Sequence, residues 1–155
     1  MRVFLRTLLL LAMAPVAQAQ DRRVLAPEAT TTAVVPDGWR AQQDPNWEGT
    51  KYVSPQGESS LVLYSLRRRQ PSVEAHIRWF SALPGERVTY RARGRGWIVV
   101  SGFKQNGRIF YRKALLACNG RVWQHLSFEY PTSRKRAFDR LVTRTSHSLR
   151  RHGCD

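Results

Sequence analysis

The sequence predicts an α+β domain: a single, mostly antiparallel sheet of about six to seven strands with two amphipathic helices packed on it. The main observation is the stretch 97–130, where Asn106-Gly107 and Asn119-Gly120 separate three runs rich in β-branched and aromatic residues. Asn-Gly tolerates the positive φ angles of a type I′ hairpin turn, so these runs predict two hairpins on a shared middle strand. Apolar residues recur at helical spacing near residues 73–83 and 138–149, which predicts the two helices.

Three strands are predicted before the first helix. Pro36-Asp37-Gly38 forms a turn, because proline presets φ and glycine accepts the left-handed conformation. Strands follow at residues 39–44, 50–54 and 60–66, and Trp47 in the first intervening loop is expected to be partly exposed. Residues 60–66 are apolar on both faces, which predicts a strand in the middle of a sheet covered on both sides.

A helix is predicted from Ser72 to about Leu83, with Ser72 as N-cap and Pro84-Gly85 as the stop. The next strand, residues 87–93, alternates apolar and basic positions. We expect Val88, Tyr90 and Ala92 to face the core. The side chains expected to face solvent are those of Arg87, Thr89, Arg91 and Arg93. Charged outer positions are typical of an edge strand, where they discourage pairing with another chain.

The last three strands are expected at residues 97–103, 108–118 and 121–130. In the third, alternation puts Val122, Gln124, Leu126, Phe128 and Tyr130 on one face and the other face carries Trp123, His125, Ser127 and Glu129. A final helix begins after Pro131, with Thr132 or Ser133 as cap. Its apolar stripe packs on the sheet and consists of Phe138, Leu141, Val142, Thr145 and Leu149.

Residues 1–19 have the pattern of a cleavable secretory signal. Arg2 and Arg6 precede the apolar run 8–16, and Ala17-Gln18-Ala19 supplies an A-x-A cleavage site. The run is shorter than the roughly 20 apolar residues of a membrane-spanning helix, so we expect no membrane span. The expected organisation is a flexible leader at 20–35, with Val34 and Val35 as a possible strand start, and one domain at 36–155. The expected location is the bacterial periplasm, with secretion beyond it left open.

The exported chain keeps two cysteines, Cys118 beside the second Asn-Gly turn and Cys154 next to the last residue. An even cysteine count in an oxidising compartment predicts a disulfide. The bond would pin the C-terminal tail to the hairpin tip and stabilise the fold by about 3–4 kcal/mol. The spacing is not C-x-x-C, which argues against a redox-active pair.

A basic surface is the best functional lead in the sequence. The chain has 26 Lys and Arg against 11 Asp and Glu, a net charge of +15, which falls to +13 when Arg2 and Arg6 are removed. Two groups stand out, Arg67, Arg68 and Arg69 and then Arg87, Arg91, Arg93 and Arg95. If the helix between them returns the chain across the sheet, both groups lie at one end and form an anion site.

The expected partner of such a site is an acidic protein or an anionic envelope component, because excess positive charge favours anionic surfaces. Export argues against nucleic acid as the partner, and we expect a monomer. The alternative explanation is that these arginines only protect a sheet edge and keep the protein in solution.

Catalytic motifs are not found, so we predict a protein that is not an enzyme and needs no cofactor or metal. There is no G-x-S-x-G, and the four histidines are scattered without metal-binding spacing. The alternative is a hydrolase-like site at His125, Trp123 and Glu129, although the sequence favours a packed, hydrogen-bonded His125 over a catalytic base. The five tryptophans would allow a carbohydrate-stacking platform, but large aromatics more often fill a core.

The order of elements resembles the PsbP-like family of α/β/α sandwiches. The similarity lies in Pro36-Asp37-Gly38-Trp39, in the hairpin Tyr52-Val53-Ser54-Pro55-Gln56-Gly57, in the single crossing helix and in the terminal hairpins followed by an amphipathic helix. The resemblance implies a binding or accessory role, because members of that family are chiefly non-enzymatic: extrinsic photosystem subunits, a nuclear transport factor that binds a small GTPase, and exported bacterial proteins. No position matches a binding motif of the family, so the resemblance assigns no functional residue.

Overall fold

The structure is a computed structural model that describes residues 22–25, 31–43, 49–69 and 72–151. In chain order the elements are β1 Arg22–Leu25, β2 Thr31–Val35, β3 Arg40–Gln42, β4 Thr50–Val53, β5 Ser60–Arg67, α1 Val73–Ser81, β6 Glu86–Gly94, β7 Trp97–Lys104, β8 Arg108–Ala117, β9 Val122–Pro131, α2 Lys135–Ser148 and β10 Arg150–Arg151. The predicted α+β class is confirmed.

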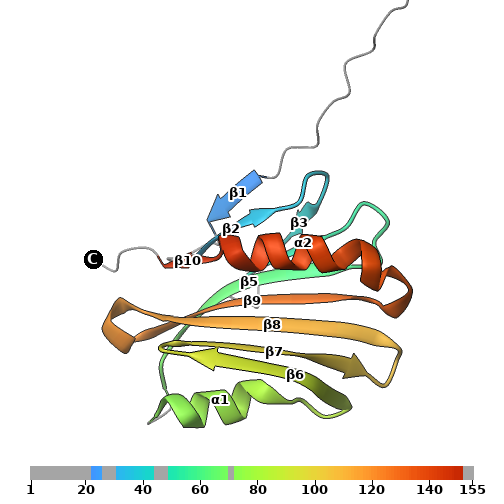
Figure 1. The fold of residues 1–155 in the computed structure, drawn as a ribbon. Coiled ribbons are helices and arrows are strands. Elements are labelled where there is room, and N and C mark those ends of the chain that lie inside the picture. Colours follow the sequence, from blue (N-terminus) through green and yellow to red (C-terminus); the bar gives the residue numbers. More distant parts are fainter. Residues whose placement is uncertain (1–21, 26–30, 44–48, 70–71, 152–155) are drawn as a thin grey trace, which may run out of the picture.

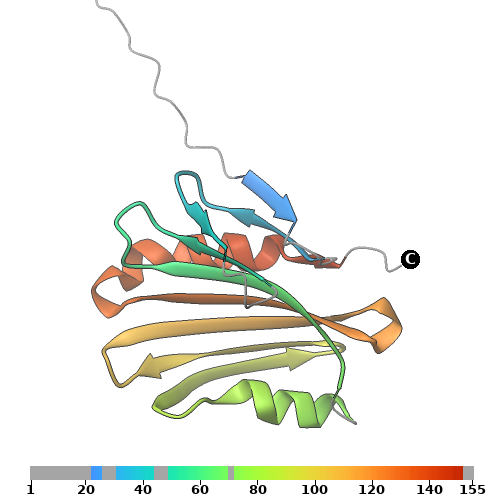
Figure 2. The same cartoon turned by 180° about the vertical axis from the view of Figure 1, so that it is seen from behind.

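Seven strands form one antiparallel sheet in the order β3-β4-β5-β9-β8-β7-β6, and a small sheet has the order β1-β2-β10. Helix α2 runs alongside β2, β5 and β9 (Figures 1 and 2), whereas α1 packs on the other face through Phe80, against β7, β8 and Trp123 of β9. Strand β5 sits between β4 and β9, which agrees with the prediction that residues 60–66 are inside the sheet.

Each helix covers a different face of the large sheet, and each face has its own apolar core. Under α1 the core contains Phe80, Ile98, Val100, Phe110, Ala114 and Trp123. The larger core under α2 and β2 includes Ala33, Val35, Trp39, Leu61, Leu63, Leu126, Phe128, Phe138, Val142 and Leu149. Residues of the two cores alternate along β9, because successive side chains of a strand point to opposite faces of the sheet.

The leader predicted at residues 20–35 is wrong where the structure describes it. Residues 31–35 form β2, which pairs with both β1 and β10. Ala33 and Val35 are fully buried in the core under α2. Strand β2 is therefore part of the fold, held by apolar burial and by hydrogen bonding on both sides.

Both helices begin near their predicted positions, but only one has the predicted cap. The Ser72 hydroxyl accepts a hydrogen bond from the Ala75 backbone N–H at 3.1 Å, which confirms Ser72 as the N-cap of α1. Helix α2 follows a 3₁₀ turn at Thr132–Arg134, and its N-cap residue, Arg134, makes no capping bond from its side chain. The prediction of Thr132 or Ser133 as cap is wrong, because the chain coils tightly there before the α-helix starts.

The two Asn-Gly corners do join β7, β8 and β9 into a meander. At the second corner both Asn119 and Gly120 have positive φ, and the Arg121 N–H donates to the Cys118 carbonyl at 3.1 Å, as in a type I′ turn. At the first corner only Gly107 has positive φ, and its N–H donates to Lys104. The type I′ prediction is wrong there, because the loop has three residues and a left-handed glycine closes it.

The edge strand β6 contains a bulge that the alternation did not predict. The register to β7 shifts between Val88 and Tyr90, leaving Thr89 as the extra residue. Val88 packs on the core under α1, but Tyr90 lies on the opposite face and is 56% exposed. The prediction that Tyr90 faces the core is wrong, because one inserted residue reverses every later side chain.

Candidate functional site

The arginines after β5 lie at one end of the large sheet. Arg67 pairs with Val122 at the start of β9, and the Arg68 N–H donates to the Arg121 carbonyl at 2.7 Å. The Arg68 guanidinium also reaches the Gly120 carbonyl at 3.4 Å. These contacts place the first predicted arginine group beside the loop 118–121.

The second arginine group is divided between the two ends and the two faces of β6. Arg93 is opposite Ile98 and Arg95 lies in the turn to β7, at the same end of the sheet as Arg67. Arg91 and Arg93 lie on the face of α1, because their partners Val100 and Ile98 belong to that core. Arg87 lies at the opposite end and on the other face, where its guanidinium sits 5.3 Å from the Phe103 ring centre.

We use the name arginine end for the sheet end that carries Arg67, Arg68, Arg69, Arg93, Arg95 and Arg121. Three strands separate β5 from β6, a distance of about 19 Å at roughly 4.8 Å per strand. The two groups therefore share an end without converging on one small anion. Their spacing suits a surface with several negative charges.

Carboxylates gather at the opposite end, where they are paired. Glu129 binds Lys104 and Arg108, the latter at 2.6 Å. Glu58 pairs with Arg134 at 3.4 Å. Burial opposes ionisation of Glu129, but hydrogen bonds from its two partners outweigh it and lower the pKa. The acids at this end therefore contribute little unbalanced negative charge.

Glu86 and Arg112 form the most buried ion pair of the described residues. Their side chains are 2% and 10% exposed, and one of the two contacts measures 2.8 Å. The Arg112 guanidinium also lies 4.6 Å from the Phe110 ring centre. Such a bidentate pair fixes the start of β6 against β8.

The hydrolase-like alternative at His125 is not supported, because the ring is enclosed. His125 is 0% exposed, stacks on Tyr64 with 4.4 Å between ring centres and lies 5.1 Å from Phe80. Burial, with a smaller effect of His76, lowers the His125 pKa to about 3. Neither ring nitrogen has a hydrogen-bond partner among the described residues, so the predicted hydrogen-bonded packing is only half right.

Glu129 and Trp123 do not join His125 in a site. Trp123 is fully buried and stacks on His76 at 4.2 Å, whereas Glu129 is occupied by Lys104 and Arg108. A substrate could not reach His125 without displacing α1. The three residues share a strand face, as predicted, but Trp123 and His125 lie among the packed rings under α1, and Glu129 lies in an ion-pair cluster at the other end of β9.

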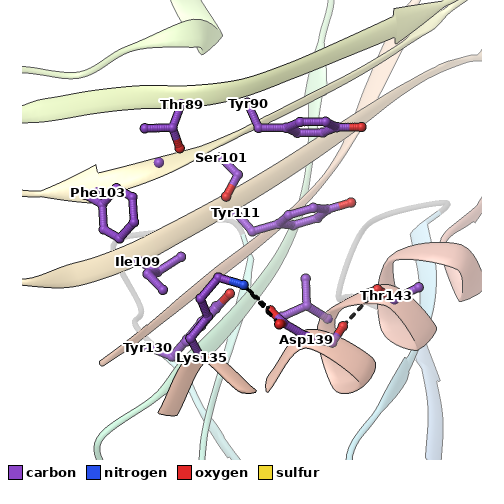
Figure 3. A pocket seen from close by; sticks show the side chains of 12 residues that line it. Thr89, Tyr90, Ser101, Phe103, Ile109, Tyr111, Tyr130, Lys135, Asp139 and Thr143 are labelled. Carbon is purple, nitrogen blue, oxygen red and sulfur yellow. Dashed lines mark hydrogen bonds and ion pairs between the residues drawn. The ribbon is translucent and has the colours of Figure 1, made fainter. Parts of the chain in front are cut away.

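A groove that the sequence did not predict opens between α2 and the sheet. It has a volume of about 340 Å³ and lies where α2 leaves the face of β6, β7 and β8 uncovered. Its lining residues are Thr89, Tyr90, Ser101, Gly102, Phe103, Ile109, Tyr111, Tyr130, Lys135, Asp139, Val142 and Thr143. Figure 3 shows the rings of Tyr90 and Tyr111 extending in the same direction from the sheet.

The sheet register sets the groove's central feature. Tyr90 is opposite Ser101 on β7, and Ser101 is opposite Tyr111 on β8. Two tyrosines thus flank a small residue, at about 10 Å between their strands. We call this gap the tyrosine slot; it is lined by Tyr90, Ser101 and Tyr111.

The groove has a mixed lining of aromatic, apolar and hydroxyl side chains and carries no net charge from it. Lys135 and Asp139 face each other at 2.9 Å (Figure 3). Burial, followed by the nearby Asp139, raises the pKa of Tyr130 to about 12, and burial also raises the pKa of Tyr111. Both phenols are therefore protonated hydrogen-bond donors at neutral pH.

One sequence signal could have located the groove. Gly102 stands inside a strand, which often marks a bulge or a close backbone approach. A Cβ at Gly102 would lie 2.0 Å from the Arg87 carbonyl oxygen. The glycine therefore permits the close contact with β6 at the bulge that turns Tyr90 into the groove.

Some predictions fall on residues outside the described ranges, namely the signal at 1–19, Trp47 and Cys154. Cys118 is not a free thiol, and its pairing with Cys154 stays a prediction. Neither described helix has the length and apolar character needed to cross a bilayer. Within the described ranges, no three metal-ligating side chains cluster.

The fold is PsbP-like, which confirms the resemblance. No protein-family model and no curated protein matches the sequence, but solved structures match the fold. CyanoP, the PsbP of the cyanobacterium Synechocystis, aligns with a TM-score of 0.64 at 9% identity, over 92% of this chain and 99% of that one.

Two further proteins have the same architecture. The Ran-binding protein Mog1p of Saccharomyces cerevisiae aligns with a TM-score of 0.59 at 9% identity, over 86% of this chain and 96% of that one. LpqN of Mycobacterium tuberculosis, a protein involved in cell envelope biogenesis, aligns with a TM-score of 0.54 at 16% identity, over 86% and 91%. At such identities the similarity shows the fold alone.

Proposed function

We propose that this chain is an exported accessory protein that binds an anionic partner through the arginine end and catalyses no reaction. The partner is an acidic protein or an anionic component of the bacterial envelope. The observation that carries the proposal is the uneven distribution of charge. Among the described residues, the ion pairs involve acids at or near the opposite end, Glu58, Glu86, Glu129 and Asp139.

The arginine end has the exposure and spacing for such a role. Five of its arginines make no ion pair within the described part of the chain: Arg67, Arg69, Arg93, Arg95 and Arg121. All five are exposed. Because the two groups lie about 19 Å apart, the partner is expected to present several separated negative charges, as an acidic protein face or a lipid surface does.

The proposed periplasmic location is supported by the secretory signal pattern at residues 1–19. The similar structures agree with an accessory role, since Mog1p binds Ran and LpqN acts in envelope biogenesis. We further propose that Cys118 pairs with Cys154. Because Cys118 lies in the loop 118–121, the bond would tether the C-terminal tail beside the arginine end.

Charge reversal tests the proposal. Arg67→Glu with Arg95→Glu changes two exposed arginines of the arginine end, and Arg136→Glu with Arg140→Glu makes the same change on the exposed side of α2. Both variants and the wild type are used for capture from periplasmic extract and for binding to vesicles with and without phosphatidylglycerol. Light scattering checks the expected monomer.

The expected result is that the arginine-end variant loses the captured protein or the anionic vesicles, whereas the α2 variant retains them. Binding should also weaken as salt rises, because exposed charges are screened beyond about 8–10 Å at physiological ionic strength. Equal binding by both variants, or binding that salt leaves unchanged, would refute the arginine end as the contact surface.

A further inference from the structure

We propose that the groove between α2 and strands β6–β8 binds a neutral saccharide, with one sugar ring held in the tyrosine slot. The proposal does not depend on the arginine end. It rests on the shape of the groove, on the kinds of side chain that line it, and on the balance of its charges.

The slot has the form that a flat ring requires. Ser101 is small and is held to the sheet, since its hydroxyl donates to the Phe110 carbonyl at 2.8 Å. Tyr90 and Tyr111 rise on either side of it, and their rings extend in the same direction (Figure 3). A volume of about 340 Å³ lies in the range of small-ligand pockets, about 300–1,000 Å³.

Tyr90 is the strongest single indication of a ligand. It is one of three large apolar or aromatic residues that the described chain leaves mostly exposed, at 56%. It also lines the groove, whereas the exposed Trp79 and Leu83 lie on or just after α1. Tyrosine offers an apolar ring face and a polar tip, and it loses little conformational freedom on binding.

The charges of the groove argue for an uncharged ligand. Lys135 and Asp139 neutralise each other. Two cations outside the lining are engaged elsewhere: Arg87 with the ring of Phe103, and Lys113 with the Ser146 carbonyl at 2.7 Å. An anionic ligand would meet Asp139, and a cationic ligand would meet Lys135. A neutral molecule can instead accept from Lys135 and donate to Asp139 without breaking their pair.

Hydroxyl groups supply the remaining recognition. The Tyr111 hydroxyl contacts the Ser146 hydroxyl at 2.6 Å, which orients it, and Thr143 donates to the Asp139 carbonyl at 2.8 Å. Tyr130 remains protonated, since its pKa is raised to about 12. A pyranose matches this lining, because its ring faces are apolar and stack on aromatics while its edge carries hydroxyls.

The test uses four defined probes: N,N′,N″-triacetylchitotriose and maltotriose as neutral saccharides, tri-galacturonic acid as an anionic one, and a glutamate hexapeptide. Binding to the ¹⁵N-labelled protein is followed by chemical-shift changes. Tyr90→Ala removes one wall of the slot, and Thr143→Trp blocks the mouth from an exposed position on α2. Trp79→Ala, which removes an equally exposed aromatic from α1, is the matched control.

We expect at least one neutral saccharide to bind with a dissociation constant of about 1 mM or tighter, and to shift the amides of Ser101, Gly102 and Tyr111. Tyr90→Ala should weaken this binding by about fivefold or more, Thr143→Trp should abolish it, and Trp79→Ala should leave it unchanged. The proposal is overturned if no neutral saccharide binds, if Tyr90→Ala and Trp79→Ala behave alike, or if the groove takes only tri-galacturonic acid or the peptide.

The two proposals can fail separately. The charge-reversed variants test only the arginine end, because both of them keep every residue that lines the groove. Saccharide binding is measured without the anionic partner. A protein that binds the saccharide but no anionic surface would retain the groove site and lose only the proposed function.

Discussion

The two histidines beneath α1 make the free energy of unfolding depend on pH in a defined direction. His76 and His125 are 1% and 0% exposed, with their ring centres 5.2 Å apart. Burial lowers the pKa of His76 to about 4, with the positive charge of Arg68 as second cause, and lowers that of His125 to about 3. Tyr64, Phe80 and Trp123 also face these rings, and none of them supplies a negative charge.

The sign follows from where protons bind. A histidine in the unfolded chain titrates near 6.5, so acidification protonates the unfolded state first. For each histidine the free energy of unfolding is highest above pH 6.5, falls steadily as the pH drops below 6.5, and levels off once the pH is below the folded-state pKa of about 3 to 4, where the folded state binds the proton as well. At pH 5 the loss is about 2 kcal/mol for each histidine, or about 4 kcal/mol for both. That is a large share of the roughly 5–15 kcal/mol that stabilises a small domain.

Urea unfolding at pH 7 and pH 5 measures this loss. The informative variant is the double replacement His76→Phe with His125→Phe, which keeps planar rings in the stacked layer and removes the titrating groups. Its stability should fall between pH 7 and pH 5 by about 4 kcal/mol less than that of the wild type. His147→Gln changes an exposed histidine on α2 and should reproduce the wild-type fall.

The remaining titratable groups are the same in the wild type and in the double variant, so their comparison isolates the buried pair. If the double variant loses as much stability as the wild type, the two rings are hydrated or already protonated in the folded state. The packing argument for the layer under α1 would then be wrong.

Three further predictions concern single features. Gly102→Ala should destabilise the fold by about 1–3 kcal/mol, because its Cβ meets the backbone of β6 at 2.0 Å; the NMR signals of the groove should shift as well. Glu86→Ala should cost about 3–5 kcal/mol by leaving Arg112 buried without its partner, and Glu86→Leu with Arg112→Met should recover most of the loss. Cys154→Ser should lower stability by about 3–4 kcal/mol if that residue pairs with Cys118, and thermal unfolding with and without reductant distinguishes this from a pair that never forms.

The order of the elements could be predicted because local chemistry determines it. Glycine and proline turns, Ser72 as a cap and the alternation of β9 each act over a few residues. Asn119-Gly120 is a good example, since both residues tolerate the positive φ that they adopt, although Cys118 before them also has a positive φ. Such signals are readable without knowing which strands become neighbours.

The candidate sites depended on contacts between distant parts of the chain. Because β5 pairs with β9, three strands lie between β5, which carries Arg67, and β6, whose turn to β7 carries Arg95. No local pattern encodes that pairing. Enclosure of His125 depends on α1 crossing over β9. The groove depends on α2 covering β9 while leaving most of β7 open, which follows from helix packing rather than from strand periodicity.

The bulge at Thr89 explains both why the sequence did not predict the groove and how the groove stays separate from the arginine end. If β6 alternated regularly from Val88, Tyr90 would lie on the face of α1, and Arg91 would lie on the face of α2 beside the groove. The inserted residue exchanges them, so Tyr90 joins the groove and Arg91 leaves it. Gly102 on the neighbouring strand accommodates this single extra residue. The extra residue keeps the later arginines of β6 away from the tyrosine slot. One short sheet can therefore carry both an aromatic, uncharged groove and a separate arginine end.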